Sequence, residues 1–484
     1  MLMTRMIDIY SILPVMIVAG WALLLLVVDL WIPRYRKGIT ALLAAVGLAI
    51  ALGFVLASSG STILGFNQMV VLDGFASFMQ VLFLVSGMAA VALAYDYIQR
   101  MNINHGEFYV LMMFSIAGMM LMSQAYNLLM VFLALELLSI PLYVLAGFAR
   151  TRLESEEASL KYFLLGAFAS GFVLYGTALI FSATGQLDFV GIAAVVTAGS
   201  ANSVLFLIGS ALLLVGFGFK IAAVPFQMWT PDVYQGAPTP VTAFMSVAVK
   251  AAGFAALMRV FLVLFPSLSE HLTPILWLMA ALTMIVGNIV ALAQNNIKRM
   301  LAYSAIAHAG YILMAFVAFG NGEVVRNTVA ATLFYLVAYG LTSFGAWALV
   351  VVIEREYGKG ILLDDLAGIG KHYPWLGVAM LVFMLSFAGV PLTMGFWGKF
   401  YLFRTAVQAG YIGLAIIGLL TSVASAYYYL RVVVYMFMKP GEPKLQINPW
   451  VSFVIGVAAL AVLLLSLMPW TILELASRAV LLLQ

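Results

Sequence analysis

The sequence contains no cysteine among its 484 residues and has few charged side chains. Without cysteine the chain cannot form disulfide bonds, hold iron–sulfur clusters by thiolates or use a cysteine nucleophile, so redox chemistry must lie in another protein. Charged residues make up 9% of the chain and hydrophobic residues 65%. A soluble domain is about a quarter charged and about half apolar, so this composition excludes a water-soluble protein.

Long apolar runs recur from one end of the chain to the other. Each can cross the roughly 30 Å hydrocarbon layer as a helix of about 20 residues, and none shows the alternation typical of barrel strands. We therefore expect an all-α membrane protein with about fourteen transmembrane helices and no separate soluble domain, so that residues 1–484 form one transmembrane domain. The predicted spans are 13–31, 39–58, 75–95, 108–122, 128–148, 155–182, 204–235, 241–265, 275–293, 301–319, 329–352, 376–403, 411–438 and 451–467.

The loops that follow odd-numbered helices carry most of the lysine and arginine residues outside the spans, for example Arg36, Arg150 and Lys298. Loops rich in these residues face the cytoplasm. With an even number of spans, both termini are therefore predicted to lie outside the cytoplasm. The small net charge of +4 gives no support to nucleic-acid binding.

Predicted helices seven and twelve are each interrupted by a proline, which removes a backbone hydrogen bond. Residues 223–226 (AVPF) and 389–392 (GVPL) around these prolines resemble each other, and helices six and eleven show a weaker similarity at nearly the same spacing. We infer a repeat in which helices 4–8 (residues 108–265) match helices 9–13 (residues 275–438). Because five is an odd number, the second copy is predicted to be inverted, as in secondary transporters with paired broken helices.

Several ionisable residues fall in or near the predicted spans, where a charge costs about 2.5–3.5 kcal/mol and usually marks an ion or proton pathway. Arg259 and Arg431 lie near helix ends, so we expect their long side chains to reach the headgroups. Glu136 could be a structural ion pair between helices five and six, and His308 alone could be a core histidine. As a set, we predict that proton translocation is carried by Glu136, Lys161, Lys220, Lys250, His308 and Lys399.

Other chemistry has no visible site in the sequence. We find no metal-ligand cluster, no serine–histidine–aspartate arrangement and no phosphate-binding glycine loop, so we expect no cofactor or metal in this chain.

Several motifs spread over most of the chain resemble the antiporter-like membrane subunits of respiratory complex I, the proton-translocating NADH:quinone oxidoreductase, and among these the N-type subunits. They are residues 135–139 (LELLS), 157–162 (EASLKY), 220–241 (KIAAVPFQMWTPDVYQGAPTPV), 296–308 (NIKRMLAYSAIAH) and 389–391 (GVP) through 398–400 (GKF). The resemblance implies a bacterial inner membrane and the other membrane and peripheral subunits of complex I as partners. NADH, FMN, iron–sulfur clusters and quinone are then expected elsewhere in the complex, which makes this chain a non-redox subunit of a translocase.

The resemblance also implies individual roles. Glu136 is expected to pair with Lys161 and to modulate Lys220, while Lys250 and His308 continue a hydrated path toward Lys399. The protons move from the cytoplasm outward, driven by quinone reduction in neighbouring subunits. The main alternative is a subunit of a multisubunit cation/proton antiporter, which shares this fold. A membrane scaffold with vestigial buried charges and an independent solute carrier are further alternatives.

Overall fold

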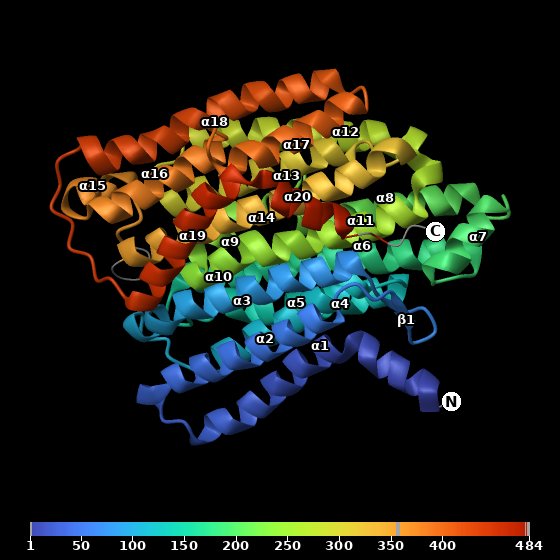
Figure 1. The fold of residues 1–484 in the computed structure, drawn as a ribbon, viewed down its shortest axis with the longest axis horizontal. Helices are drawn as coiled ribbons and strands as arrows, with labels where there is room; N and C mark the ends of the chain where they lie inside the picture. The colour runs from blue at the N-terminus through green and yellow to red at the C-terminus, as the bar shows by residue number, and fades with distance from the viewer. Residues whose placement is uncertain (1, 355–358, 480, 482–484) are drawn as a thin grey trace.

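Helices make up almost all regular structure in the computed structural model, which describes residues 2–354, 359–479 and 481 (Figure 1). The first helices are α1 (Leu2–Val28), α2 (Gly38–Ser58), α3 (Gly74–Arg100), α4 (Glu107–Gln124), α5 (Leu128–Ala146), α6 (Leu153–Thr184) and α7 (Phe189–Thr197). The middle of the chain forms α8 (Ser203–Lys220), α9 (Trp229–Gly236), α10 (Thr239–Phe244), a π-helical segment (Met245–Val249), α11 (Lys250–Leu264), α12 (Ser269–Leu292) and α13 (Ile297–Phe316). The remainder forms α14 (Gly322–Ile353), α15 (Ile369–His372), α16 (Pro374–Ala388), α17 (Met394–Gln408), α18 (Ile412–Met438), α19 (Pro449–Leu467) and α20 (Pro469–Arg478). Strands β1 (Ile63–Gly65) and β2 (Val70–Leu72) pair antiparallel.

Twelve of the described helices are long and apolar enough to cross a membrane, which confirms the prediction of an all-α, multi-span membrane protein. The predicted tenth and twelfth spans coincide with α13 and with the pair α16 and α17, which are not among the twelve. Helix α13 carries Lys298, Arg299 and His308, and α16 has only 15 residues. The short helix α7 and the β1–β2 hairpin were not predicted.

Short polar side chains set where several helices begin. In each case an aspartate or asparagine at the N-cap accepts a hydrogen bond from a backbone N–H two or three residues later, which satisfies a donor that the first turn leaves without a partner. These caps are Asp73 for α3, Asn127 for α5, Asn202 for α8, Asn296 for α13 and Asn448 for α19.

Both predicted interruptions coincide with gaps between helices. Helix α8 ends at Lys220 and α9 begins at Trp229, and within this gap the backbone N–H of Val224 donates to the Thr283 hydroxyl of α12 at 2.9 Å. A neighbouring helix thus satisfies a backbone group that the break frees. Helix α16 ends at Ala388, and the following Gly389 has a φ of +84°, the left-handed conformation that favours glycine at a helix C-terminus.

The helices differ in how deeply they lie in the bundle. In Figure 1, α1 and α2 lie along one edge and α18 along the opposite edge, with α9, α11 and α14 between them. The apolar window of the span Thr239–Leu264 is entirely buried, whereas only a third of the corresponding window of α18 is. Polar side chains on α10 and α11 therefore meet protein groups rather than lipid.

Candidate proton-translocation site

Four of the predicted site residues lie deep inside the bundle. Lys220 is 4% exposed, Lys250 2%, His308 4% and Lys399 5%, and they come from α8, α11, α13 and α17. Buried ionisable groups need polar partners, because desolvation of an unpaired charge is costly. The partners of each group therefore show what it can do.

Lys220 is the last residue of α8, where the break follows. Its Nζ donates to the Ser139 hydroxyl of α5 at 2.8 Å and to the Tyr162 hydroxyl of α6 at 3.2 Å. The Tyr162 ring stacks on Trp229, the first residue of α9, with ring centroids 4.7 Å apart. Lys220 is thus held between two helices and the break, by neutral hydroxyl groups.

Glu136 and Lys161 do not form the ion pair that the resemblance implies. Lys161, whose side chain is 39% exposed, bonds instead to Glu157 of its own helix and to Asp232 of α9, each at 2.6 Å. Arg299 of α13 binds the other oxygen of Asp232 at 2.7 Å. Within the described residues, the Oε1 atom of Glu136 is buried without a hydrogen-bond partner. Glu136 lies one turn before Ser139, which is a Lys220 partner, on the same face of α5.

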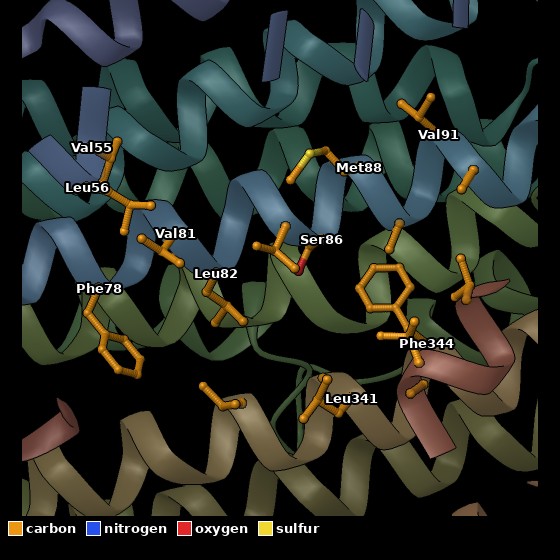
Figure 2. Close-up of a pocket in the computed structure, with 18 of the residues that line it drawn as sticks. Val55, Leu56, Phe78, Val81, Leu82, Ser86, Met88, Val91, Leu341 and Phe344 are labelled. Atoms are coloured by element: carbon orange, nitrogen blue, oxygen red, sulfur yellow. The ribbon is translucent and has the colours of Figure 1, made fainter. Parts of the chain in front are cut away.

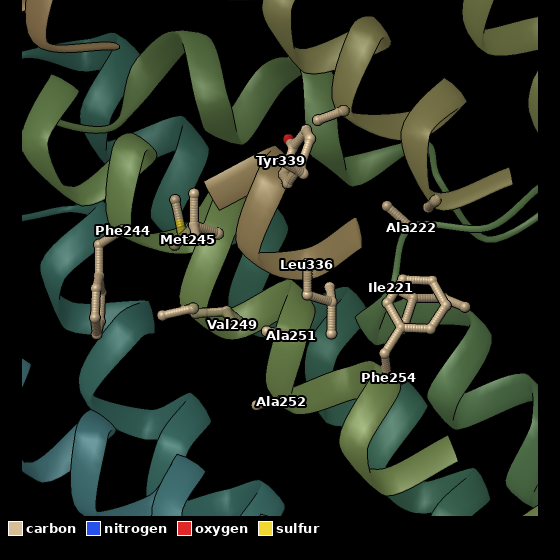
Figure 3. Packing of buried hydrophobic residues seen from close by; sticks show 14 of the residues in the cluster. Ile221, Ala222, Phe244, Met245, Val249, Ala251, Ala252, Phe254, Leu336 and Tyr339 are labelled. Atoms are coloured by element: carbon tan, nitrogen blue, oxygen red, sulfur yellow. The ribbon is translucent and has the colours of Figure 1, made fainter. Parts of the chain in front are cut away.

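Lys250 directly follows the π-helical segment. Its Nζ donates a short hydrogen bond to the Ala305 carbonyl of α13 and lies 5.6 Å from the centroid of the Tyr339 ring of α14. Figure 3 shows the apolar packing around this turn, with Val249, Ala251 and Ala252 on one ribbon and Tyr339 on the next. The ammonium group therefore connects α11 with α13.

His308 lies between two phenol groups. Its Nδ1 is 2.5 Å from the Tyr335 hydroxyl of α14, and its Nε2 is 3.0 Å from the Tyr429 hydroxyl of α18. The Tyr429 hydroxyl is also 2.5 Å from Ser304 Oγ. A neutral imidazole can accept a proton at one nitrogen and release one from the other, so this arrangement can pass a proton across the ring.

Lys399 occupies the second break. Its Nζ donates to the Phe387 carbonyl at 2.8 Å, the Ala388 carbonyl at 3.1 Å and the Ser422 hydroxyl at 2.7 Å. Phe387 and Ala388 are the last two residues of α16, where carbonyl groups have no partner within the helix. The Phe387 ring also lies 5.2 Å from the His308 ring, which places Lys399 next to the histidine.

Neighbouring residues link the four buried groups: Lys250 bonds to Ala305, one turn before His308, and Phe387 contacts both His308 and Lys399. Gly253, one turn after Lys250, packs against Lys220. We call these four residues the buried row; Glu136 lies near Lys220, and Lys161 belongs to a more exposed charged cluster. The prediction did not include the hydroxyl groups that surround these residues, which are Ser139, Tyr162, Ser304, Tyr335, Ser422 and Tyr429. Ser139, Tyr162 and Ser304 lie inside motifs that carried the resemblance. Tyr335, Ser422 and Tyr429 resemble ordinary residues of membrane helices, and nothing in the sequence marks them.

The prediction for Arg259 was wrong. Its guanidinium group is fully buried and forms two hydrogen bonds to Asp73, the N-cap residue of α3, instead of reaching the headgroups. Arg431 is half-buried and donates to the Gln294 carbonyl. No group of three His, Asp or Glu side chains that could hold a metal ion occurs in the part of the chain that the structure describes.

A cavity of about 1030 Å³ lies away from the buried row, between α2 and α3 on one side and α14, α19 and α20 on the other. Figure 2 shows its apolar walls, which include Phe78, Leu82, Leu341 and Phe344. Among its described lining residues, only Arg478 is charged. We therefore give this cavity no part in the proton path.

Comparison with known proteins identifies the family. The model of the NADH:quinone oxidoreductase/Mrp antiporter transmembrane family matches residues 125–425, which include all six predicted site residues. The chain belongs to this family. It is 48% identical to NADH-quinone oxidoreductase subunit N of Trichlorobacter lovleyi over 98% of this chain and 97% of that protein. The resemblance inferred from the motifs is thereby confirmed.

Solved structures of this family share the fold. A chain of respiratory complex I from Thermus thermophilus with bound aureothin has a TM-score of 0.83 and 38% identity, covering 96% of this chain and 99% of its own length. A chain of the Mrp complex from a Dietzia species has a TM-score of 0.85 and 20% identity, covering 98% of this chain and 97% of its own. At 20% identity, the second match shows a shared fold and nothing more. The alternative that the chain is a subunit of a multisubunit cation/proton antiporter is therefore supported only by this shared fold.

Proposed function

We propose that this chain is a proton-translocating membrane subunit of a bacterial NADH:quinone oxidoreductase. The observation that carries the proposal is the buried row of Lys220, Lys250, His308 and Lys399, in a chain whose 48% identical relative is named subunit N of that enzyme. Within the described residues, no carboxylate oxygen lies within 4.0 Å of the Nζ of these three lysines, in contrast to Arg259. Their charge is therefore not fixed by an ion pair.

Proton movement along this row needs only transfers between nitrogen and oxygen atoms. Lys220 exchanges its proton with water near Ser139 and Tyr162, and water between the broken helices passes it to Lys250. His308 receives a proton at one ring nitrogen and gives one up at the other, toward Tyr335 or Tyr429. Lys399 then releases its proton beyond the second break.

Glu136 is proposed to control the first step. Its carboxyl group lies one helical turn from Ser139, so an ionised Glu136 favours the protonated form of Lys220 and a neutral one favours proton release. If the Lys161 ammonium group leaves Asp232 and Glu157, it can pair with Glu136 instead. This pairing would weaken the effect of the Glu136 charge on Lys220. Quinone reduction in neighbouring subunits would drive the change, while NADH, FMN, iron–sulfur clusters and quinone are bound outside this chain.

The finer architecture is part of the same proposal. We propose fourteen spans in a bacterial inner membrane with both termini outside the cytoplasm, and inverted repeats at residues 108–265 and 275–438. Corresponding helix pairs pack together in both halves: α4 with α5 and α12 with α13, and α6 with α8 and α14 with α16. That equivalent pairs of helices pack together in both halves supports the repeat.

The test is proton pumping coupled to quinone reduction in membrane vesicles that carry Lys220→Ala. Lys444→Ala, in an exposed loop, is the matched control that removes a lysine outside the row. We expect Lys220→Ala to abolish pumping while the assembled complex stays at its normal level on native gels. A normal proton yield per electron pair would refute the proposal and favour a scaffold.

A further inference from the structure

The contact between α10 with its π-helical extension and α14 is a buried seam with polar groups at both ends. At one end the Thr239 hydroxyl donates a short hydrogen bond to the Glu354 carboxylate, and at the other the Ser246 and Ser343 hydroxyls are 3.1 Å apart. All four side chains are at most 1% exposed. Their partners are therefore protein groups rather than lipid or solvent.

The inner end of the seam leads to Lys250. Ser343 lies one helical turn after Tyr339 on the same face of α14, and the Tyr339 ring lies 5.6 Å from the Lys250 ammonium. Figure 3 shows Met245 and Val249 of the π segment beside Leu336 and Tyr339 of α14. π-Helical turns are rare and frequently occur at functional sites, and this one contains Ser246 and ends directly before Lys250.

The outer end of the seam carries a buried acid–base pair. Lys298 is fully buried, with its Nζ 4.0 Å from Glu354 Oε1 and donating to the Ala237 carbonyl at 2.9 Å. The next residue, Arg299, belongs to the charged cluster with Asp232 and Lys161, whose side chains are 32–39% exposed. The pair is thus next in sequence to a partly exposed charged cluster, in a loop region that is rich in lysine and arginine.

We propose that this seam is a second proton-uptake route, which runs from the charged face to Lys250 without passing Lys220. Glu354 takes up the proton at the outer end, and Ser246, Ser343 and Tyr339 hand it to Lys250 at the inner end. Eleven residues of α14 separate Ser343 from Glu354, or about 16 Å along the helix, so water must enter between the two polar ends during transfer. This inference rests on the proposed function.

The Thr242 hydroxyl lies midway between the two ends and donates to the Tyr234 carbonyl at 3.0 Å. It is fully buried and offers water one polar partner inside the otherwise apolar stretch. Each step moves only a proton: Glu354 gains one from the charged face and loses it inward, and Lys250 passes one toward His308. No oxidant or reductant is required.

The double variant S246A/S343A tests the inner end. The two serine hydroxyls bond to each other, so removing both together leaves neither without its partner, and the fold is expected to survive. We expect quinone reduction and pumping to fall by about a hundredfold or more, because a positioned proton-transfer group typically contributes about 10²–10⁴-fold to a rate. We also expect a steeper decline as the pH on the uptake side rises. The control S210A removes a buried hydroxyl that bonds only within α8 and is expected to behave as wild type.

A wild-type rate and pH dependence in S246A/S343A would overturn the proposal. If Lys220→Ala still abolishes pumping in the same membranes, the proposed function stands without this route. If both variants pump normally, the proposed function fails as well.

The variants E354Q and E354D test the outer end. E354Q is expected to show the same slow, pH-sensitive turnover, and E354D, which keeps a carboxylate, is expected to restore at least part of the rate. If the Lys298–Glu354 pair only holds α13 against α14, E354Q should contain less assembled complex, and the remaining complex should show the wild-type pH dependence of turnover. That result would overturn the role of Glu354.

Discussion

The buried ion pair between Arg259 and Asp73 yields a quantitative prediction. Arg259 Nη1 and Nη2 bind the two carboxylate oxygens of Asp73 at 2.6 and 2.9 Å, and Nη2 also donates to the Ser123 carbonyl at 2.7 Å. Asp73 in turn caps α3 by accepting from the Ala76 N–H at 2.8 Å. The substitution Asp73→Asn keeps a good capping residue but removes the negative charge, so it isolates the ion pair.

The magnitude follows from burial. Arg259 is 0% and Asp73 2% exposed, and breaking one side of such a pair costs about 3–5 kcal/mol because a buried charge remains without its counter-ion. Unfolding entropy is about 2.1 cal/mol/K per residue, or about 1 kcal/mol/K for a chain of this length. We therefore expect Asp73→Asn to lower the melting temperature of the subunit by about 3–5 °C.

The assay is the amount of subunit that remains soluble after detergent-extracted membranes are heated, followed by immunoblot. The control is Asp364→Asn, which breaks an exposed pair with Lys439 and is expected to leave the melting curve in place. The double variant Asp73→Asn/Arg259→Met is expected to recover most of the loss, because it leaves no buried charge without a counter-ion. Equal melting of Asp73→Asn and the control would refute this reasoning.

Two further predictions concern the second break and the orientation of the chain. A Cβ atom at Gly395 would overlap the Ser386 carbonyl, whereas one at Gly413 would meet nothing within 4 Å. We therefore expect Gly395→Ala, but not Gly413→Ala, to reduce the amount of assembled complex on native gels. Equal amounts of complex in the two variants would contradict this packing. Because the chain has no cysteine, Lys444→Cys and Ser200→Cys can each be labelled singly with a membrane-impermeant maleimide. In intact cells with the outer membrane permeabilised, Ser200→Cys should react and Lys444→Cys should not; the opposite pattern would invert the predicted topology.

The sequence was informative where local chemistry decides the outcome. A proline inside an apolar run must free backbone groups, so the breaks around Pro225 and Pro391 were predictable, and continuous hydropathy gave the spans. The buried positions of Lys220, Lys250 and Lys399 followed from their places within those spans.

Partners that lie far away in the sequence were not predictable. Arg259 lies near a helix end, from where its side chain can either reach the headgroups or bond inside the bundle. The position of Asp73, which is 186 residues away in the sequence, decides between the two. Lys161 likewise meets Asp232 because the break turns α9 back against α6, a path that no local pattern specifies. The hydroxyl groups of Tyr335 and Tyr429 become candidates for proton transfer only because they contact His308.

The structure stabilises buried cations in two different ways, and the difference separates fixed charges from movable ones. Arg259 and Lys37 each bind a carboxylate directly, at 2.6 and 2.5 Å, and arginine does not release its proton in proteins. Lys220 is instead the last residue of α8, and the Lys399 ammonium of α17 binds carbonyl groups at the C-terminal end of α16. At such an end the helix dipole favours a cation by only about 0.3–2 kcal/mol. A break in the middle of an apolar span creates such an end where no carboxylate is needed. Under the proposed function, the broken helices hold a lysine charge firmly enough to bury it and weakly enough for its proton to leave.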